Sequence, residues 1–143
     1  MSGIKSPSRK APATDVLIVA HGLPSDTGAG ETAIARVAAN VQTLLPGRKV
    51  TAVTMAADGA LERAVGGLND EALVFPMFMS DGWFVRTELP RRLGRSAVRV
   101  LPPFGQHPQL PMLAAQTVRS RTGPPRPARF AVKCRFPKST FYG

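Results

Sequence analysis

The sequence contains very little cysteine and no long apolar run. A single cysteine, Cys134, among 143 residues excludes an intrachain disulfide framework and a cysteine-rich zinc site. The longest apolar runs, at 16–20 and 72–79, are far too short to cross a bilayer. No apolar stretch follows the basic N-terminus, so it does not resemble a secretory signal. These absences favour a soluble, cytoplasmic protein with no membrane partner.

Motifs for nucleotide binding are missing as well. Neither GxGxxG nor GxxxxGK[ST] occurs, so the sequence offers no glycine-rich loop to hold the phosphates of a nucleotide cofactor. The GxSxG motif of many serine hydrolases is also absent. We therefore expect no nucleotide cofactor.

The middle of the chain lacks a charge bias, although the whole chain has a formal charge of +10. Residues 11–118 contain nine basic and nine acidic side chains, whereas residues 1–10 and 119–143 contain basic side chains and no acidic ones. A nucleic-acid interface normally gathers Lys and Arg on one folded element. The balanced middle shows no such cluster, so specific nucleic-acid binding is not expected.

Composition divides the chain into three segments. Residues 1–14 are rich in Ser, Pro and Lys and predict a disordered leader. Residues 15–118 have the alternating apolar patterns of one globular domain. Residues 119–143 are basic, Pro-rich and non-periodic, which predicts either a disordered tail or a truncated second half.

Within residues 15–118, strand patterns alternate with helix patterns. Four apolar runs predict buried strands: 16–20, 49–55, 72–79 and 97–101. Four segments with apolar residues at helical spacing predict helices: 34–45, 58–68, 85–93 and 108–118. Asp58 is expected to cap the second helix, and Pro90 to kink the third. Strict alternation is typical of βαβ units, so we predict an α/β fold with a four-stranded parallel sheet and helices on both faces.

In such sheets the functional side chains lie in loops beyond the carboxyl ends of the strands. His21 follows the first predicted strand and is the best candidate, because a neutral imidazole can accept a proton or bind a transition metal. It could equally hydrogen-bond a neighbouring loop. Trp83 and Phe84 could line an aromatic ligand site or pack beneath the third helix. The second histidine, His107, precedes a Pro and is interpreted as a capping or packing residue.

Three motifs together carry a family resemblance: VLIVAHGLPSD at 16–26, LVFPMFMSDGWFVRTELP at 73–90 and VLPPFGQHPQLPMLA at 100–114. In order and spacing they resemble the CbiX-type sirohydrochlorin cobaltochelatases, small metal chelatases of the class that includes the ferrochelatases. The resemblance spans residues 15–118 and implies a flavodoxin-like chelatase half-unit. Short members of the family are one such half and pair as homodimers, whereas long members carry two halves in tandem.

The reaction that the resemblance implies is insertion of a divalent metal into a tetrapyrrole such as sirohydrochlorin, towards cobalamin or siroheme. Cobalt is favoured, with nickel and iron as alternatives. His21 stands where the family has its first-strand His. Phe84 occupies the position of a second His, and Met55 that of a frequent Glu.

The predicted site consists of His21 as metal ligand and base, Asp81 as a second metal ligand, and Ser25, Trp83 and Phe84 as contacts to the tetrapyrrole. Two other interpretations stay open. One is a non-catalytic module that binds a tetrapyrrole or metal for a partner. The other is a fragment of a two-half chelatase.

Overall fold

The structure is a computed structural model that describes residues 14–121. The leader predicted at 1–14 and the tail predicted at 119–143 therefore lie outside the described residues, apart from Thr14 and residues 119–121. The chain divides into two compact units, with the boundary between Leu110 and Pro111.

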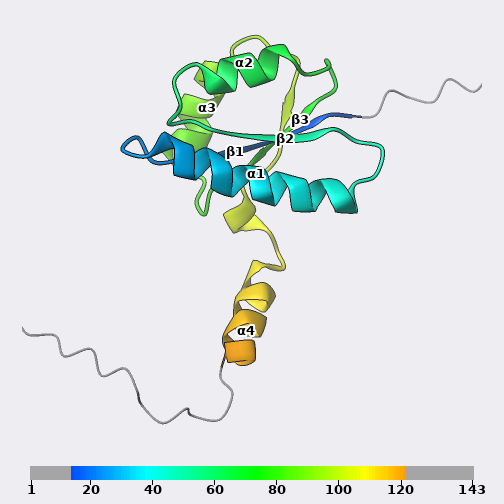
Figure 1. The fold of residues 1–143 in the computed structure, drawn as a ribbon, viewed down its shortest axis with the longest axis vertical. Helices are drawn as coiled ribbons and strands as arrows, with labels where there is room; N and C mark the ends of the chain where they lie inside the picture. The colour runs from blue at the N-terminus through cyan, green and yellow to red at the C-terminus, as the bar shows by residue number, and fades with distance from the viewer. Residues whose placement is uncertain (1–13, 122–143) are drawn as a thin grey trace, which may run out of the picture. The chain divides into compact units, whose positions relative to one another are not determined.

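Four strands form one sheet (Figure 1). They are β1 (Val16–Ala20), β2 (Val50–Thr54), β3 (Leu73–Pro76) and β4 (Arg99–Val100). The strand order is β2-β1-β3-β4, and every neighbouring pair is parallel. The predicted four-stranded parallel sheet is confirmed, with β1 as an interior strand.

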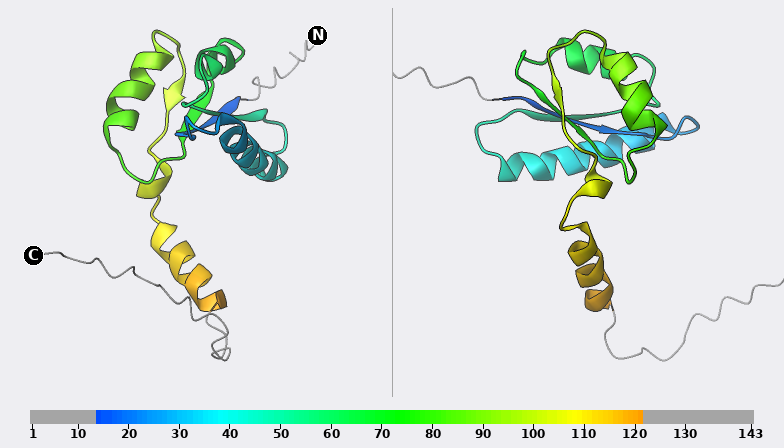
Figure 2. Two further views of the ribbon diagram at one scale, coloured as in Figure 1. Left: turned by 60° about the vertical axis from the view of Figure 1, so that its left-hand side comes forward. Right: turned by 180° about the vertical axis from the view of Figure 1, so that it is seen from behind.

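Helices cover both faces of this sheet (Figure 2). On one face lies α1 (Thr27–Leu44), and on the other lie α2 (Ala60–Gly66) and α3 (Leu89–Leu93). This layering explains why the first strand is apolar at every position. Because successive side chains point to opposite faces, β1 contributes to two cores.

The two cores share the side chains of β1 in alternation. Val16 and Ile18 pack against Ile34 of α1. Leu17 and Val19 face the other way, into the core that also contains residues of α2 and α3. Leu17, Ile18 and Val19 are at most 1% exposed. Burial of a side chain of this size contributes about 1.5–3 kcal/mol, so β1 holds the carboxyl edge of the sheet rigidly.

The first two helices begin at residues other than those predicted. Helix α1 begins at Thr27, seven residues before the predicted start at 34, because Oδ1 of Asp26 accepts a hydrogen bond from the N–H of Ala29 at 3.0 Å. Helix α2 begins at Ala60 after Gly59, whose φ of +65° is left-handed, and no side chain caps it. The predicted cap at Asp58 is therefore wrong.

The fourth strand is shorter than the predicted run 97–101. The N–H of Leu101 still donates to the carbonyl of Val74 at 2.9 Å. Pro102 and Pro103 follow, and neither has an N–H to continue the ladder.

The third helix changes its hydrogen-bond pattern near Pro90. Phe84–Glu88 forms a π-helical turn, in which the N–H of Leu89 donates to the carbonyl of Phe84, five residues earlier. Helix α3 follows, with Pro90 in its first turn. Such turns occur frequently at functional sites, and this one sets the positions of Phe84 and Glu88.

The second unit contains most of α4 (Leu110–Arg121), which begins two residues after the predicted start at 108 and ends three residues after the predicted end at 118. None of its residues is buried, and Met112, Leu113 and Val118 are 54%, 51% and 62% exposed. Across residues 14–121, no helix is both long and apolar enough to span a membrane.

Candidate functional site

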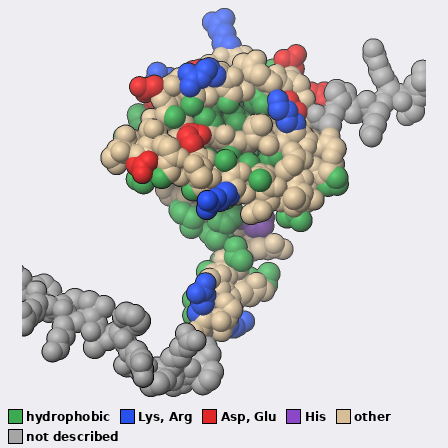
Figure 3. All heavy atoms as spheres, viewed as in Figure 1, with side chains coloured by type: hydrophobic (Ala, Val, Ile, Leu, Met, Phe, Trp, Pro, Cys, Tyr) green, Lys and Arg blue, Asp and Glu red, His purple; other side chains and the backbone are tan. Residues whose placement is uncertain are grey.

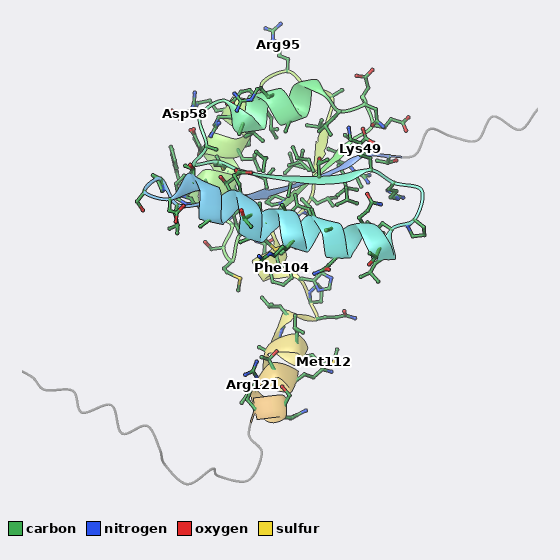
Figure 4. The ribbon with its side chains drawn as sticks, viewed as in Figure 1. Lys49, Asp58, Arg95, Phe104, Met112 and Arg121 are labelled. Carbon is green, nitrogen blue, oxygen red and sulfur yellow. The ribbon has the colours of Figure 1, made fainter. Side chains whose placement is uncertain are left out.

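The predicted site lies at the carboxyl ends of the strands. Lys49 directly precedes β2 in the sequence, and Asp58 follows it. In Figure 4, where both residues are labelled, the end of the sheet near Asp58 is therefore its carboxyl edge. The surface in Figure 3 carries acidic and basic side chains side by side, in keeping with the balanced charge of the middle of the chain. No patch of one charge marks the site on the face shown, so individual side chains define it.

His21 is placed by the backbone that follows β1. Its carbonyl accepts a hydrogen bond from the N–H of Ala56 at 3.0 Å, which continues the pairing of β1 with β2 past the ends of both strands. Gly22 then turns the chain with a φ of +78°. A Cβ at Gly22 would lie only 2.6 Å from Cβ of Thr54, so this turn requires glycine.

The imidazole of His21 is oriented by its own backbone. Nδ1 lies 2.9 Å from the carbonyl oxygen of Gly22. That oxygen can only accept, so Nδ1 carries the proton in the neutral ring, and the lone pair remains on Nε2. His21 is exposed, so Nε2 is the nitrogen that can accept a proton or bind a metal ion.

Aromatic rings surround this imidazole. The centroids of the His21 and Phe84 rings lie 4.3 Å apart, with the ring planes nearly perpendicular. The ring centroids of Trp83 and Phe84 lie 5.1 Å apart, and those of Phe78 and His21 lie 6.5 Å apart. Trp83 is 60% exposed and Phe84 is 37% exposed. Trp83 and Phe84 thus form an exposed aromatic edge beside His21, rather than packing wholly beneath the third helix.

A pocket of about 250 Å³ opens beside His21. Its lining includes His21, Met55, Phe84, Glu88 and Arg92. Two of the positions singled out by the resemblance, Met55 and Phe84, therefore line the same pocket as His21.

Three predicted site residues, Trp83, Ser25 and Asp81, lie outside that lining. Ser25 is exposed in the turn before α1. Asp81 lies in the loop after β3, where its Oδ2 accepts hydrogen bonds from Arg86 at 2.9 Å. The Asp81 carboxylate raises the pKa of Arg86 above its ordinary value.

Arg92 is a pocket residue that the sequence analysis missed. Its guanidinium donates to both carboxylate oxygens of Glu62, at 2.6 and 2.8 Å, and to the carbonyl of Met55 at 2.7 Å. The hydrogen bond from Arg92 lowers the pKa of Glu62 to about 2. Arg92 therefore ties α2 and α3 to the end of β2. No local pattern indicates this pair, because its members are 30 residues apart.

Glu88 is a second missed residue, at the last position of the π turn. Both of its carboxylate oxygens accept hydrogen bonds from Arg91, at 2.7 and 2.9 Å. These bonds hold the pKa of Glu88 below its ordinary value. The helical spacing of Phe84 and Glu88 was the available sequence signal, because residues four apart lie close together on one side of a helical turn.

Glu31 of α1 is a third residue that the sequence analysis missed, and it supports the carboxyl end of β2. Oε1 of Glu31 accepts hydrogen bonds from both the N–H and the hydroxyl of Thr54, at 2.7 and 2.6 Å. Thr54 is buried and ends β2, which is an edge strand of the sheet. Glu31 thus satisfies a backbone donor that has no neighbouring strand to bind.

The other imidazole lies elsewhere. Nδ1 of His107 accepts a hydrogen bond from the N–H of Gln109 at 3.2 Å, a local contact of the kind predicted for a capping residue. His107 lines a separate pocket of about 450 Å³ with Phe75 and Leu101. Within residues 14–121, no three His, Cys, Asp or Glu side chains are grouped closely enough to hold a metal ion together.

Comparisons with known proteins bear on this arrangement. The sequence model of the CbiX family matches residues 15–121. A solved structure of CbiX, described as the terminal enzyme for biosynthesis of siroheme in denitrifying bacteria, is 46% identical, with a TM-score of 0.63 over 75% of this chain and 49% of that chain. A crystal structure from Marinobacter aquaeolei VT8, described as a CbiX protein of cobalamin (vitamin B12) biosynthesis, is 19% identical, with a TM-score of 0.56 over 76% of this chain and 96% of that chain. No match was found among proteins with curated descriptions.

The four-stranded parallel sheet with helices on both faces defines an open α/β protein, and the solved CbiX structures share this fold. The chain belongs to the CbiX family, because the family match covers most of its length. It spans about half the length of the 46% identical relative, 49% of that chain.

Proposed function

We propose that this protein inserts a divalent metal ion, its substrate, into a tetrapyrrole of the sirohydrochlorin type. The observation that carries the proposal is His21, which stands at the carboxyl end of an interior strand beside an exposed aromatic edge, in a chain of the CbiX family. The description of the 46% identical relative names siroheme, an iron tetrapyrrole. It favours iron, whereas the sequence resemblance favours cobalt, and the test therefore includes both metals.

The residues at the edge suit the demands of this reaction. Insertion requires a base for the pyrrole N–H protons and a ligand that holds the ion while it loses water. Nε2 of His21 can serve in either role. The exposed rings of Trp83 and Phe84 offer apolar surface on which a flat macrocycle can stack.

The second candidate function is binding without insertion. Phe84 brings a phenyl ring to the position where the family resemblance places a second imidazole. A protein with this edge could carry a tetrapyrrole or a metal ion for a partner. It would bind the macrocycle but leave metal insertion at the rate seen without protein.

The exposed rings of Trp83 and Phe84 offer a surface to a second copy of the chain, and the family resemblance implies that members with a single half pair as homodimers. We propose a homodimer, in which a second copy faces the exposed aromatic edge. Sedimentation equilibrium of the purified chain tests this. A monomer at micromolar concentration, with and without sirohydrochlorin, would contradict it.

Insertion is tested by mixing the purified protein with sirohydrochlorin and Co²⁺, or Fe²⁺ without oxygen, and following the visible absorption of the macrocycle. We expect the protein to accelerate insertion and His21→Ala to reduce the rate to that of the protein-free reaction. His107→Ala, which removes the imidazole outside the site, serves as the matched control and should retain the rate. Macrocycle binding without acceleration would favour the binding module.

A further inference from the structure

The pocket beside His21 contains a carboxylate that neither the sequence motifs nor the family comparison assigns. Among the described residues that line this pocket, Glu88 is the one acid. Its side chain is only 16% exposed, so the carboxylate lies against the pocket wall. Asp81, the acid predicted from the sequence, is not part of the lining and is bonded to Arg86.

The π turn places Glu88 in the lining of the same pocket as Phe84, whose ring contacts His21. Phe84 begins this turn and Glu88 ends it. The Phe84 ring lies 4.3 Å from that of His21. The two ends of one helical turn lie on the same side of it, which accounts for Phe84 and Glu88 both lining the pocket.

The present partner of Glu88 can be exchanged. Arg91, which binds both carboxylate oxygens, has a side chain that is 67% exposed. An ion pair with so exposed a partner is weak and easily broken. The guanidinium that does line the pocket, that of Arg92, is already bonded to Glu62 and to the carbonyl of Met55. An incoming divalent cation can therefore replace Arg91 on Glu88 without exposing an unpaired charge inside the pocket.

We propose that Glu88 and His21 together receive the divalent metal ion before it enters the macrocycle. This inference rests on the proposed function and names the residues that hold its metal substrate. One nitrogen and one carboxylate leave the remaining coordination positions to water and to the pyrrole nitrogens. A structural zinc site has four protein ligands, whereas an ion that must leave for the macrocycle needs fewer.

The experiment measures metal binding by the full chain in the absence of tetrapyrrole. The protein has a single tryptophan, Trp83, whose ring lies 5.1 Å from that of Phe84, so paramagnetic Co²⁺ bound in the pocket should quench its fluorescence. Titration with Co²⁺ is compared for wild type, His21→Ala and Glu88→Gln. Glu71→Gln, an exposed acid in a pocket at the amino-terminal edge, is the matched control. Thermal melting of each variant shows that it is folded.

We expect Glu88→Gln and His21→Ala each to weaken Co²⁺ binding on the order of tenfold or more, since changes even to groups behind a ligand reach that size. Glu71→Gln should bind as wild type does. Arg91→Gln should bind Co²⁺ more tightly, because the cation that competes for Glu88 is gone. A merely structural role for Glu88 would not produce this opposite change.

The outcomes separate this inference from the proposed function. If Glu88→Gln binds Co²⁺ as wild type does while His21→Ala does not, or if Asp81→Asn alone weakens binding, Glu88 is not the partner of His21 and insertion can still hold. If Glu88→Gln and His21→Ala both weaken binding but wild type does not insert metal into sirohydrochlorin, the metal site stands and the proposed function fails. Wild type that binds no Co²⁺ overturns the site.

Discussion

Replacing Phe84 with His should give the proposed metal site a second imidazole beside that of His21. The rings of His21 and Phe84 have centroids 4.3 Å apart and planes at 87°. A metal–nitrogen bond of about 2.0–2.1 Å places an imidazole centroid about 3.2 Å from the ion. Two such rings that bind one ion at roughly 90–110° have centroids about 4.5–5.2 Å apart. The new ring therefore needs a shift of about 1 Å or less, which an exposed turn can accommodate.

We expect Phe84→His to raise Co²⁺ affinity about 10–100-fold, or about 1.4–2.7 kcal/mol. The cost in stability should be about 1 kcal/mol, because an aromatic pair contributes about 0.5–1.5 kcal/mol and this ring is already 37% exposed. The affinity is measured by the visible absorption of bound Co²⁺ at about pH 8, where imidazoles are neutral. Urea unfolding measures the stability.

The matched control is Phe84→Leu, which also removes the phenyl ring but adds no ligand. Its Co²⁺ affinity should not exceed that of wild type. If Phe84→His binds Co²⁺ no more tightly than Phe84→Leu, the two rings do not face a common metal position. The assignment of this edge as the metal site would then be refuted.

Three further predictions concern the supports of the site. Gly105→Ala should destabilise the protein by roughly 2–4 kcal/mol, because its Cβ would overlap the carbonyl oxygen of Met79, whereas Gly66→Ala, with nothing within 4 Å, should not; urea unfolding compares them. The pKa of Glu62 is about 2, so its stabilisation is present above about pH 4.5 and is lost as the pH falls towards 2. Since its side chain is 46% exposed, the loss should be about 1 kcal/mol or less, and the melting temperature of Glu62→Gln should fall less over that range. Glu31→Ala should cost about 1–3 kcal/mol by leaving the buried donors of Thr54 unpaired, and equal unfolding curves for this variant and wild type would contradict this.

The parallel sheet could be predicted because its first strand, β1, is buried on both faces. The continuous apolar run of β1 has no polar face, and only a sheet covered on both sides accommodates such a strand. Helix starts were less accessible, because they depend on which polar residue actually caps. Asp26 caps α1, whereas Asp58, a similar residue before the next helix, does not cap α2.

The part of the site that could be predicted consists of the residues that directly follow the strands. His21 follows β1 and Phe84 lies in the connection after the neighbouring β3, so parallel topology already places both at one edge. Glu88 was not predicted, because its position depends on the π turn before Pro90. The Arg92–Glu62 pair was not predicted either, because it joins two helices whose packing no local pattern encodes.

The charges around the pocket determine whether a divalent cation can enter it. Arg92 lines the pocket, and an unpaired guanidinium there would repel the ion. Glu62 holds that guanidinium through two hydrogen bonds, and its pKa of about 2 keeps the carboxylate ionised throughout the neutral range. With Arg92 neutralised and Arg91 free to move into solvent, the carboxylate of Glu88 and the imidazole of His21 are the groups left to attract a metal ion. Because Glu62 pairs with Arg92 and Arg91 can leave Glu88, the two arginines of α3 do not prevent the proposed metal ion from binding in the pocket.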